Sequence, residues 1–158
     1  MSYNSAHLER GGLPRSVNPV PDGYHTVTPY LTVANAAALI DFLQKAFNAT
    51  LKYNMKDDSG NVRHAEMQIG DSMVMIGQAR DQWVPKPANF YLYVPDCDAV
   101  FQSAMSAGGK VVMEPANQFY GDRHGGVDDP EGNTWWIATH LEDVSPEELE
   151  RRMKAAAH

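Results

Sequence analysis

His64 and Glu66 are the two residues of this chain whose types and spacing best suit acid–base or metal chemistry. They lie two positions apart in VRHAEMQI, a stretch that alternates polar and apolar residues as a half-buried strand does. Side chains two apart in a strand share a face, so the imidazole and the carboxylate could act together as general base and acid. The same pair could instead hold a displaced metal ion, or be ordinary hydrogen-bonded surface groups.

A face rich in hydroxyl, amide and aromatic groups accompanies this pair. The strand expected from about Val27 alternates apolar residues with threonines and a tyrosine, and the strand near residue 90 alternates in the same way. Aromatic and polar walls are typical of a ligand cleft, and an ordinary solvated sheet face is the alternative. The ligand-binding residues predicted on this face are Thr28, Tyr30, His64, Glu66, Gln68, Asn89, Tyr91, Tyr93 and Trp136.

The segment GDRHGG, residues 121–126, places Arg123 and His124 among three glycines. We expect a flexible loop that closes over the cleft and binds an anion through the guanidinium group of Arg123, with His124 beside it. A plain surface hairpin is the alternative interpretation. Both residues therefore join the predicted ligand-binding set.

An internal repeat supplies the elements that must hold these residues. YLTVANAAALIDFLQKAF, from Tyr30, aligns without a gap on YLYVPDCDAVFQSAMSAG, from Tyr91, and GDSMVMI, from Gly70, corresponds to GNTWWIA, from Gly132. Each copy is predicted to be a strand, a helix and three further strands. Those further strands are expected at 51–56, 62–69 and 72–78, and then near 110–114, 118–123 and 133–140.

Three helices have recognisable starts. Asn35 and Asp96 are the expected N-caps of the two helices inside the repeat. Ser145 and Pro146 begin a C-terminal helix, with Glu148 as the reciprocal capping partner. The predicted layout is an N-terminal arm over 1–22, a single domain over 23–143 with modules 24–78 and 89–140, and a C-terminal helix over 144–158. The arm is polar and rich in Gly and Pro, so it is expected to be disordered or to lie as a strap across a partner subunit.

Composition limits the classes of function. Thirteen Lys and Arg against twenty Asp and Glu give a net charge of −7, and the basic residues are scattered, so a nucleic-acid partner is not expected. No run of about 18 apolar residues and no apolar signal-peptide core is present, so neither a membrane partner nor export is expected. Cys97 is the only cysteine, which excludes an intrachain disulfide and fits the reducing cytoplasm.

The duplicated unit and the closing stretch DDPEGNTWWIATH together resemble the vicinal oxygen chelate superfamily of glyoxalase I, extradiol dioxygenases and bleomycin-resistance proteins, and most closely its PhnB-like branch. The resemblance covers about residues 24–140 and is carried by TPYLTVANAAALIDFLQKAF, HAEMQIGDSMVMI, YLYVPDCDAVFQSAMSAGGKV and YGDRHGGVDDPEGNTWWIATH. It implies an α+β fold in which two βαβββ modules form a cupped mixed sheet. It also implies a homodimer.

Metal-dependent members of this superfamily chelate a divalent ion with a His or Glu on the first and last strand of each module. The resemblance carries those positions onto Thr28, Val74, Asn89 and Trp136, none of which is an imidazole or a carboxylate. Alternation along the last strand sends Trp135 into the core and Trp136 into the cup. There its indole could stack on a planar ligand, or merely fill the emptied metal site.

The leading hypothesis is a dimeric cytoplasmic protein that binds a small polar or aromatic molecule in each cup, with no cofactor. The bleomycin-resistance proteins of the superfamily sequester a drug in the same way, so binding without turnover is a natural function. The alternative is a lyase, isomerase or dioxygenase that uses a relocated divalent metal at His64 and Glu66, helped by His124. A third possibility, a purely structural or interaction module, predicts no ligand and a collapsed cup.

Overall fold

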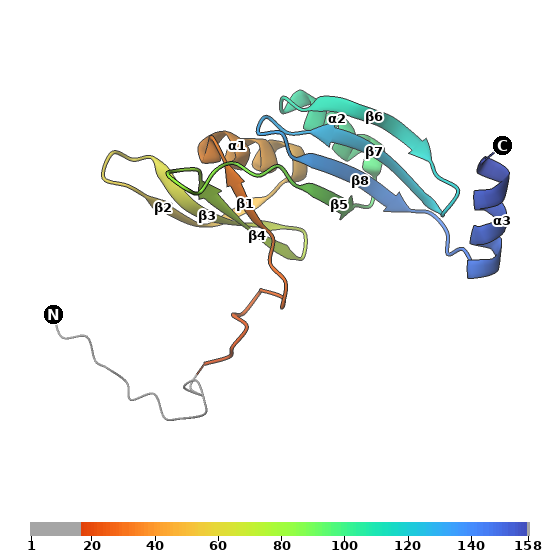
Figure 1. Cartoon of the computed structure of the whole chain (residues 1–158), viewed down its shortest axis with the longest axis horizontal. Helices are drawn as coiled ribbons and strands as arrows, with labels where there is room; N and C mark the ends of the chain where they lie inside the picture. The colour runs from red at the N-terminus through yellow and green to blue at the C-terminus, as the bar shows by residue number, and fades with distance from the viewer. Residues whose placement is uncertain (1–16, 158) are drawn as a thin grey trace.

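The computed structural model describes residues 17–157, so most of the predicted N-terminal arm, residues 1–16, lies outside the described residues. Figure 1 shows α1 and α2 side by side near the centre, with a sheet extending to each side and α3 beyond the far end of the second sheet. The elements in chain order are β1 (Tyr30–Val33), α1 (Ala36–Phe47), β2 (Thr50–Lys56), β3 (Val62–Ile69), β4 (Ser72–Gln78), β5 (Asn89–Tyr93), α2 (Cys97–Ser106), β6 (Lys110–Asn117), β7 (Asp122–Asp128), β8 (Thr134–His140) and α3 (Pro146–Ala156).

The strands form two four-stranded mixed sheets with the same topology. Their orders are β1-β4-β3-β2 and β5-β8-β7-β6. In each sheet the first strand of the module runs parallel to the last, and the other pairs are antiparallel. Tyr30 pairs with Met75 and Tyr91 pairs with Trp136, so the modules also share one register. The predicted α+β fold of two βαβββ modules is confirmed.

β1 is shorter than the sequence predicts. Alternation suggests a strand from Val27, but β1 begins at Tyr30 and the side chain of Val27 is 82% exposed. Pro29 has no N–H to donate to a ladder. Its carbonyl accepts from the N–H of Met75 at 2.9 Å, so pairing with β4 starts only at this residue.

The helices begin where the sequence predicts and bury one apolar face each. Asn35 accepts a hydrogen bond from the N–H of Ala38, and Asp96 accepts one from the N–H of Ala99. Each cap satisfies a donor that the first helical turn leaves without a partner. Full burial of one Leu or Phe stabilises the fold by about 1.5–3 kcal/mol. The larger side chains buried in this way are Leu39, Ile40, Phe42 and Leu43 of α1 and Phe101 of α2.

One hydrophobic core joins the two modules. The ring of Phe47, at the end of α1, lies 5.0 Å from the ring of Trp135 in β8, and Phe90 stacks on the same indole at 4.4 Å. Trp135 is 2% exposed and its indole N–H donates to Asp129 at 2.9 Å, so the prediction that it belongs to the core is confirmed. At the surface, Glu131 accepts from the backbone N–H of Asn35 in the other module.

Two strands of the second module differ from the prediction. β6 is longer than the expected strand near 110–114, and β7 replaces the expected strand near 118–123. The segment 121–126, predicted as a flexible loop or a surface hairpin, lies mostly in β7, which is an interior strand. A Cβ atom at Gly125 would come within 2.9 Å of the ring of Phe101, and one at Gly126 within 2.6 Å of the ring of Trp136. These glycines therefore permit close packing instead of providing flexibility.

α3 begins as predicted but is held differently. Ser145 accepts from the N–H of Glu148, and Pro146 occupies the first turn. The carboxylate of Glu148 does not reach back as a reciprocal cap, because it pairs with Arg152 at 3.0 Å. Arg152 also pairs with Glu142 of the preceding segment at 2.5 Å, which ties the helix to the end of the domain.

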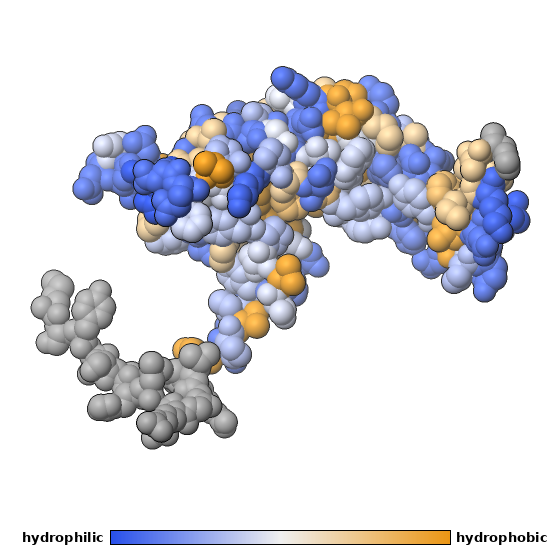
Figure 2. Space-filling model, in the orientation of Figure 1, coloured by the Kyte–Doolittle hydropathy of each residue, from blue (hydrophilic) through white to orange (hydrophobic). Residues whose placement is uncertain are grey.

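The surface seen in Figure 2 is mainly hydrophilic, and its hydrophobic residues form small separate groups. Scattered groups of this size are ordinary on a globular domain. Every helix between residues 17 and 157 is too short or too polar to cross a membrane.

Candidate functional site

Each sheet gives one face to the helices and leaves the other face open. In the first sheet Leu31, Ala65 and Ile76 share the helix side and are buried. Alternation places the next residues of each strand on the opposite side. We call the side of each sheet that faces away from the helices its open face. The open face of module one is formed by Tyr30, Thr32, His64, Glu66, Gln68 and Met75. The open face of module two is formed by Asn89, Tyr91, Tyr93, Asp122, His124 and Trp136.

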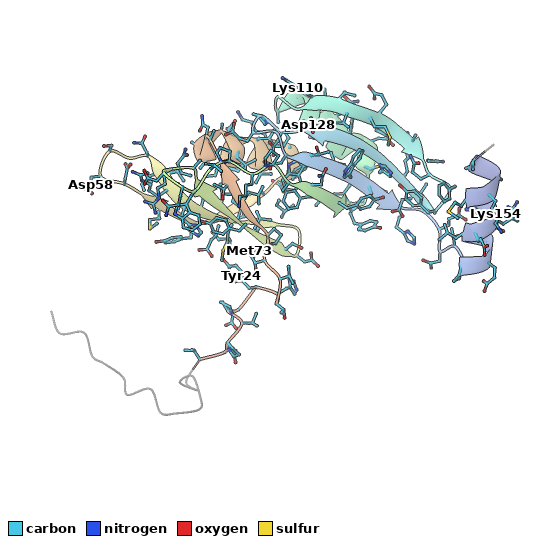
Figure 3. The ribbon with its side chains drawn as sticks, in the orientation of Figure 1. Tyr24, Asp58, Met73, Lys110, Asp128 and Lys154 are labelled. Carbon is cyan, nitrogen blue, oxygen red and sulfur yellow. The ribbon has the colours of Figure 1, made fainter. Side chains whose placement is uncertain are left out.

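The structure brings His64 and Glu66 together on the open face of module one. Nε2 of His64 lies 3.9 Å from Oε2 of Glu66, and the hydroxyl of Tyr30 lies 3.5 Å from Nδ1 of His64. Tyr24, below the first sheet in Figure 3, donates its hydroxyl to Oε1 of Glu66. Burial and this carboxylate raise the pKa of Tyr24 to about 12. Glu66 therefore holds a protonated phenol on one oxygen and faces an imidazole with the other.

Three more predicted residues lie at the margins of the open faces. Gln68 donates its side-chain amide to a carbonyl of the β3–β4 turn at 3.0 Å. Thr28 lies before β1, and its hydroxyl is 3.4 Å from the carbonyl oxygen of His25. Asn89 is the exposed first residue of β5. Their positions suit the rim of a binding surface better than its centre.

A buried carboxylate organises the open face of module two. Asp122 is 4% exposed, and its Oδ2 accepts from the hydroxyls of Tyr91 at 2.8 Å and Tyr93 at 3.0 Å. Its Oδ1 lies 2.7 Å from Nδ1 of His140, whose Nε2 lies 2.7 Å from Asp143. The two phenol rings remain exposed above this network. Asp122 thus fixes the orientation of two aromatic rings that face the opening.

The hydrogen bonds also set the charges of this cluster. Burial alone would raise the pKa of Asp122, but hydrogen bonds from His140, Tyr91 and Tyr93 outweigh burial and hold the pKa below its ordinary value of 3.8. Burial, and then the hydrogen bond to Asp122, raise the pKa of Tyr91 well above its ordinary value of 10.0. At neutral pH Asp122 is therefore a carboxylate anion, and Tyr91 and Tyr93 are neutral phenols.

His124 is 7% exposed and lies on the same face, beside Trp136. Its Nε2 hydrogen-bonds with the hydroxyl of Tyr120, and the rings of Tyr91 and Trp136 meet it edge-on at 5.5 Å and 5.7 Å. Its Nδ1 has no hydrogen-bond partner among the described residues. Burial lowers the pKa of His124 below its ordinary value of 6.5, so the imidazole is neutral at pH 7.

Trp136 lies on the open face of module two, as alternation predicts, and its indole packs against a glycine of the neighbouring strand. In the sheet it is paired with Tyr91 and Gly126. Its six-membered ring lies over Gly126, where a Cβ atom would come within 2.6 Å of it. The indole therefore covers Gly126, and its plane lies at 85° to the imidazole of His124.

Arg123 points away from the open face. Its guanidinium group binds both carboxylate oxygens of Asp98 on α2, at 2.8 Å and 2.9 Å, and donates to Asn117 at 3.1 Å. Because residues alternate along β7, Arg123 takes the helix side when Asp122 and His124 take the open side. The expectation that a loop carries Arg123 over the cleft is wrong.

One of the metal positions implied by the resemblance also needs correction. The alignment of Gly70 with Gly132 puts Val74 in the place of Trp136. The strand registers put Met75 there, and Val74 is buried on the helix side. The β7–β8 turn is longer than the β3–β4 turn, so its glycine is displaced by one residue relative to the strand.

The four corrected positions do not fit a divalent metal ion. Trp136 offers no ligand atom, Met75 offers only a soft thioether, and Thr28 and Asn89 offer neutral oxygens. Among residues 17–157 no three His, Cys, Asp or Glu side chains lie close enough together to hold a metal. His64 and Glu66 supply two donors, and Glu66 already binds Tyr24.

Sequence reasoning missed Asp122, Tyr24 and Tyr120 and left His140 without a role. Asp122 lies two residues before His124, so a strand at this position would have placed both on one face. The nearby glycines led to the prediction of a loop, so the shared face of Asp122 and His124 was not recognised. No local pattern marks Tyr24, because it lies outside the repeat.

Comparisons with known proteins agree with this architecture. The family model described as the Glyoxalase/Bleomycin resistance protein/Dioxygenase superfamily matches residues 23–137. Uncharacterized protein Rv0887c of Mycobacterium tuberculosis is 31% identical over 161 aligned positions, which cover 95% of this chain and 92% of that protein.

Solved structures show the same fold at lower identity. TioX from Micromonospora sp. ML1 superposes with a TM-score of 0.65 and 23% identity, over 73% of this chain and 98% of that one. A PhnB protein from Bacillus cereus, described as a putative 3-demethylubiquinone-9 3-methyltransferase, gives 0.59 and 18%, over 73% and 99%. At these identities the likeness establishes the fold alone, since one fold hosts many functions.

Proposed function

The chain belongs to the glyoxalase/bleomycin resistance protein/dioxygenase superfamily, and from this premise we propose that it binds a small organic molecule against its open faces without the metal quartet of the superfamily's metalloenzymes. The observation that carries the proposal is the position of Trp136. The resemblance puts it at a position where the superfamily's metalloenzymes carry a metal-binding side chain, and its indole packs against Gly126. The indole is partly exposed on this face, so it offers a ring surface for stacking.

The surroundings of Trp136 support a polar, partly aromatic ligand. Tyr91 and Tyr93 present exposed rings whose hydroxyls are already bonded to Asp122, so they offer apolar contact without an unpaired polar group. His124 keeps one ring nitrogen without a partner among the described residues. A donor or acceptor on a ligand that displaces the neighbouring side chains could satisfy that nitrogen.

A second copy of the chain completes the binding sites in this proposal. Tyr30 and Tyr93 are 57% and 61% exposed, so each open face is a shallow surface in the single chain. A homodimer that covers these faces would turn each into an enclosed cup, which small-molecule sites usually require. Cys97 is free and buried, which fits a cytoplasmic protein.

The alternative function is a metal-dependent lyase, isomerase or dioxygenase centred on His64 and Glu66. The observation in its favour is that these two side chains face each other across 3.9 Å on an open surface. In that function the chain's own imidazole and carboxylate would hold the ion and move protons at the substrate.

Metal analysis of protein purified without a histidine tag distinguishes the two functions. We expect no stoichiometric Mn, Fe, Ni or Zn and no tight binding of these ions by calorimetry. One tightly bound equivalent per chain that disappears in both His64→Ala and Glu66→Ala would replace our proposal by the alternative. Light scattering tests the dimer, which a monomeric mass at working concentration would rule out.

Ligand binding is then measured by fluorescence in a Trp83→Phe background, in which only the buried Trp135 and the open-face Trp136 emit. We expect flat polar compounds from a chemical library to quench this emission, and Trp136→Phe to remove the response. Quenching that survives Trp136→Phe would place the ligand elsewhere.

A further inference from the structure

A separate cavity lies where the segment between the modules folds over the end of the first sheet. Its volume is about 640 Å³, within the range of about 300–1,000 Å³ that is usual for small-molecule sites. It shares Tyr30, Thr32 and Gly77 with the open face of module one. The lining residues are Tyr30, Thr32, Arg63, Gly77, Gln78, Arg80, Gln82, Trp83, Val84 and Lys86.

The outer wall of this cavity is a tight turn held by the backbone. Arg80 and Trp83 exchange two backbone hydrogen bonds, at 2.9 Å and 2.8 Å, around Asp81, which adopts a φ of 48°. Further along, the N–H of Lys86 donates to the carbonyl oxygen of Thr32 at the free edge of β1, at 3.1 Å. The turn and the strand edge thus hold Arg80, Trp83 and Lys86 in fixed backbone positions around one cavity.

The lining is cationic in a chain whose net charge is −7. Arg63, Arg80 and Lys86 line the cavity, and no Asp or Glu does. Arg63 forms an ion pair with Asp57 at 3.3 Å, which partly neutralises its charge. Between residues 17 and 157, no ion pair involves Arg80 or Lys86. Two cations are therefore available for a bound anion.

Two aromatic rings border the same space. Trp83 is 60% exposed although its backbone is held in the turn by two hydrogen bonds. Packing in a hydrophobic core therefore does not explain why a tryptophan occupies this position. Tyr30 lies over Gly77, where a Cβ atom would come within 2.6 Å of its hydroxyl oxygen. Exposed aromatic rings beside unpaired cations are the groups that recognise a planar anion, because the ring stacks and the charge is neutralised.

We propose that this cavity binds a flat organic anion, with its ring against Trp83 or Tyr30 and its acidic group at Arg80 and Lys86. The site is distinct from the open face at Trp136 and does not require a ligand there. It also needs no metal ion.

The test uses 2-naphthoate as the probe and neutral 2-naphthamide as its matched control. Binding is followed by the indole N–H signals of ¹⁵N-labelled protein, which Trp83→Phe and Trp136→Phe assign. We expect 2-naphthoate to shift the Trp83 signal and to bind at least about tenfold more tightly than 2-naphthamide, because only the acid can be neutralised by the cations. A shift confined to Trp136 would report the open face and overturn this proposal while supporting the proposed function.

Charge variants separate a local site from a general effect of net charge. Arg80→Gln with Lys86→Gln should weaken 2-naphthoate binding by about tenfold or more. Arg151→Gln with Lys154→Gln on α3 removes the same charge far from the cavity and should change the affinity by less than about twofold. Equal losses in the two double variants, or equal binding of acid and amide, would overturn the proposal.

Discussion

The indole of Trp136 lies directly on Gly126 of the neighbouring strand, so close that even a methyl group at that glycine would overlap the ring. The first module contains a related pair, in which the phenol of Tyr30 lies over Gly77. In both sheets a large aromatic side chain occupies the space that the adjacent strand leaves free, because that strand carries no side chain at the position. This aromatic platform is therefore a property of two residues on two strands.

Gly126→Ala should lift or tilt the indole of Trp136. Forcing an extra methyl group into a well-packed site costs about 1–3 kcal/mol, and we expect urea unfolding to show a loss of stability in that range. The emission of Trp136, measured in the Trp83→Phe background, should change at the same time because the ring leaves its packed position.

The control for Gly126→Ala is the same substitution in a Trp136→Ala background. If the ring causes the cost, the cost should fall by at least half once the ring is gone. An unchanged cost would mean that β7 itself does not tolerate a side chain at this position, and the platform would lose its explanation.

Most of the fold follows from patterns that act over a few residues. The caps Asn35, Asp96 and Ser145 and the alternation in VRHAEMQI each reflect local chemistry, and each was predicted correctly. β7 was not predicted correctly, because its glycines make room for the rings of Phe101 and Trp136, which lie on other elements. A glycine needed for a tertiary contact has the same appearance in a sequence as a glycine needed for a turn.

The candidate site shows the same division. Alternation correctly placed Tyr91, Tyr93 and Trp136 on an open face, since two-residue periodicity is local. The partner that orients the two tyrosines, Asp122, comes from a strand two positions away in the sheet and was missed. Hydrogen-bond networks between strands depend on register, which the sequence constrains only weakly when a turn length is misjudged.

Asp122→Asn should destabilise the second module. The amide keeps one oxygen acceptor, but its NH₂ group faces a hydroxyl or an imidazole and leaves at least one partly buried donor without an acceptor. Loss of such a buried charged acceptor costs about 2 kcal/mol or more, as measured by urea unfolding. Asp143→Asn, which alters the exposed partner of the same His140, should change stability by less than about 0.5 kcal/mol. Equal effects would show that Asp122 does not organise the cluster.

Arg123 and Asp98 should behave as a surface ion pair with no part in binding at the open face. A double-mutant cycle with Arg123→Gln and Asp98→Asn should give a coupling of about 0.2–1 kcal/mol, because both groups are partly exposed. Neither variant should alter the emission of Trp136 or its quenching by a ligand. Loss of quenching in Arg123→Gln, with Asp98→Asn unaffected, would restore a direct role for Arg123 at the cleft.

His124 and His140 should titrate on opposite sides of the ordinary histidine pKa of 6.5, although both lie near Asp122. Burial lowers the pKa of His124, whereas hydrogen bonds to Asp122 and Asp143 raise the pKa of His140. Histidine NMR signals recorded against pH, and assigned with His124→Gln and His140→Gln, measure both values. The prediction fails if the two values coincide or exchange order.

The same two histidines should give opposite dependences of stability on pH. For His140, the pKa is higher in the folded state. Its contribution to the free energy of unfolding is therefore complete below about pH 6.5 and disappears as pH rises through the folded pKa. For His124, the pKa is lower in the folded state. Its contribution to the free energy of unfolding is therefore complete above about pH 6.5 and is lost as pH falls toward the folded pKa.

His140→Gln should therefore remove stability mainly on the acid side of neutrality. His124→Gln should make the protein less sensitive to acid, even if it lowers stability at every pH. Unfolding in urea from pH 5 to pH 8 compares the slopes directly, and parallel pH profiles in the two variants would contradict the assignment of one enclosed neutral imidazole and one paired imidazolium.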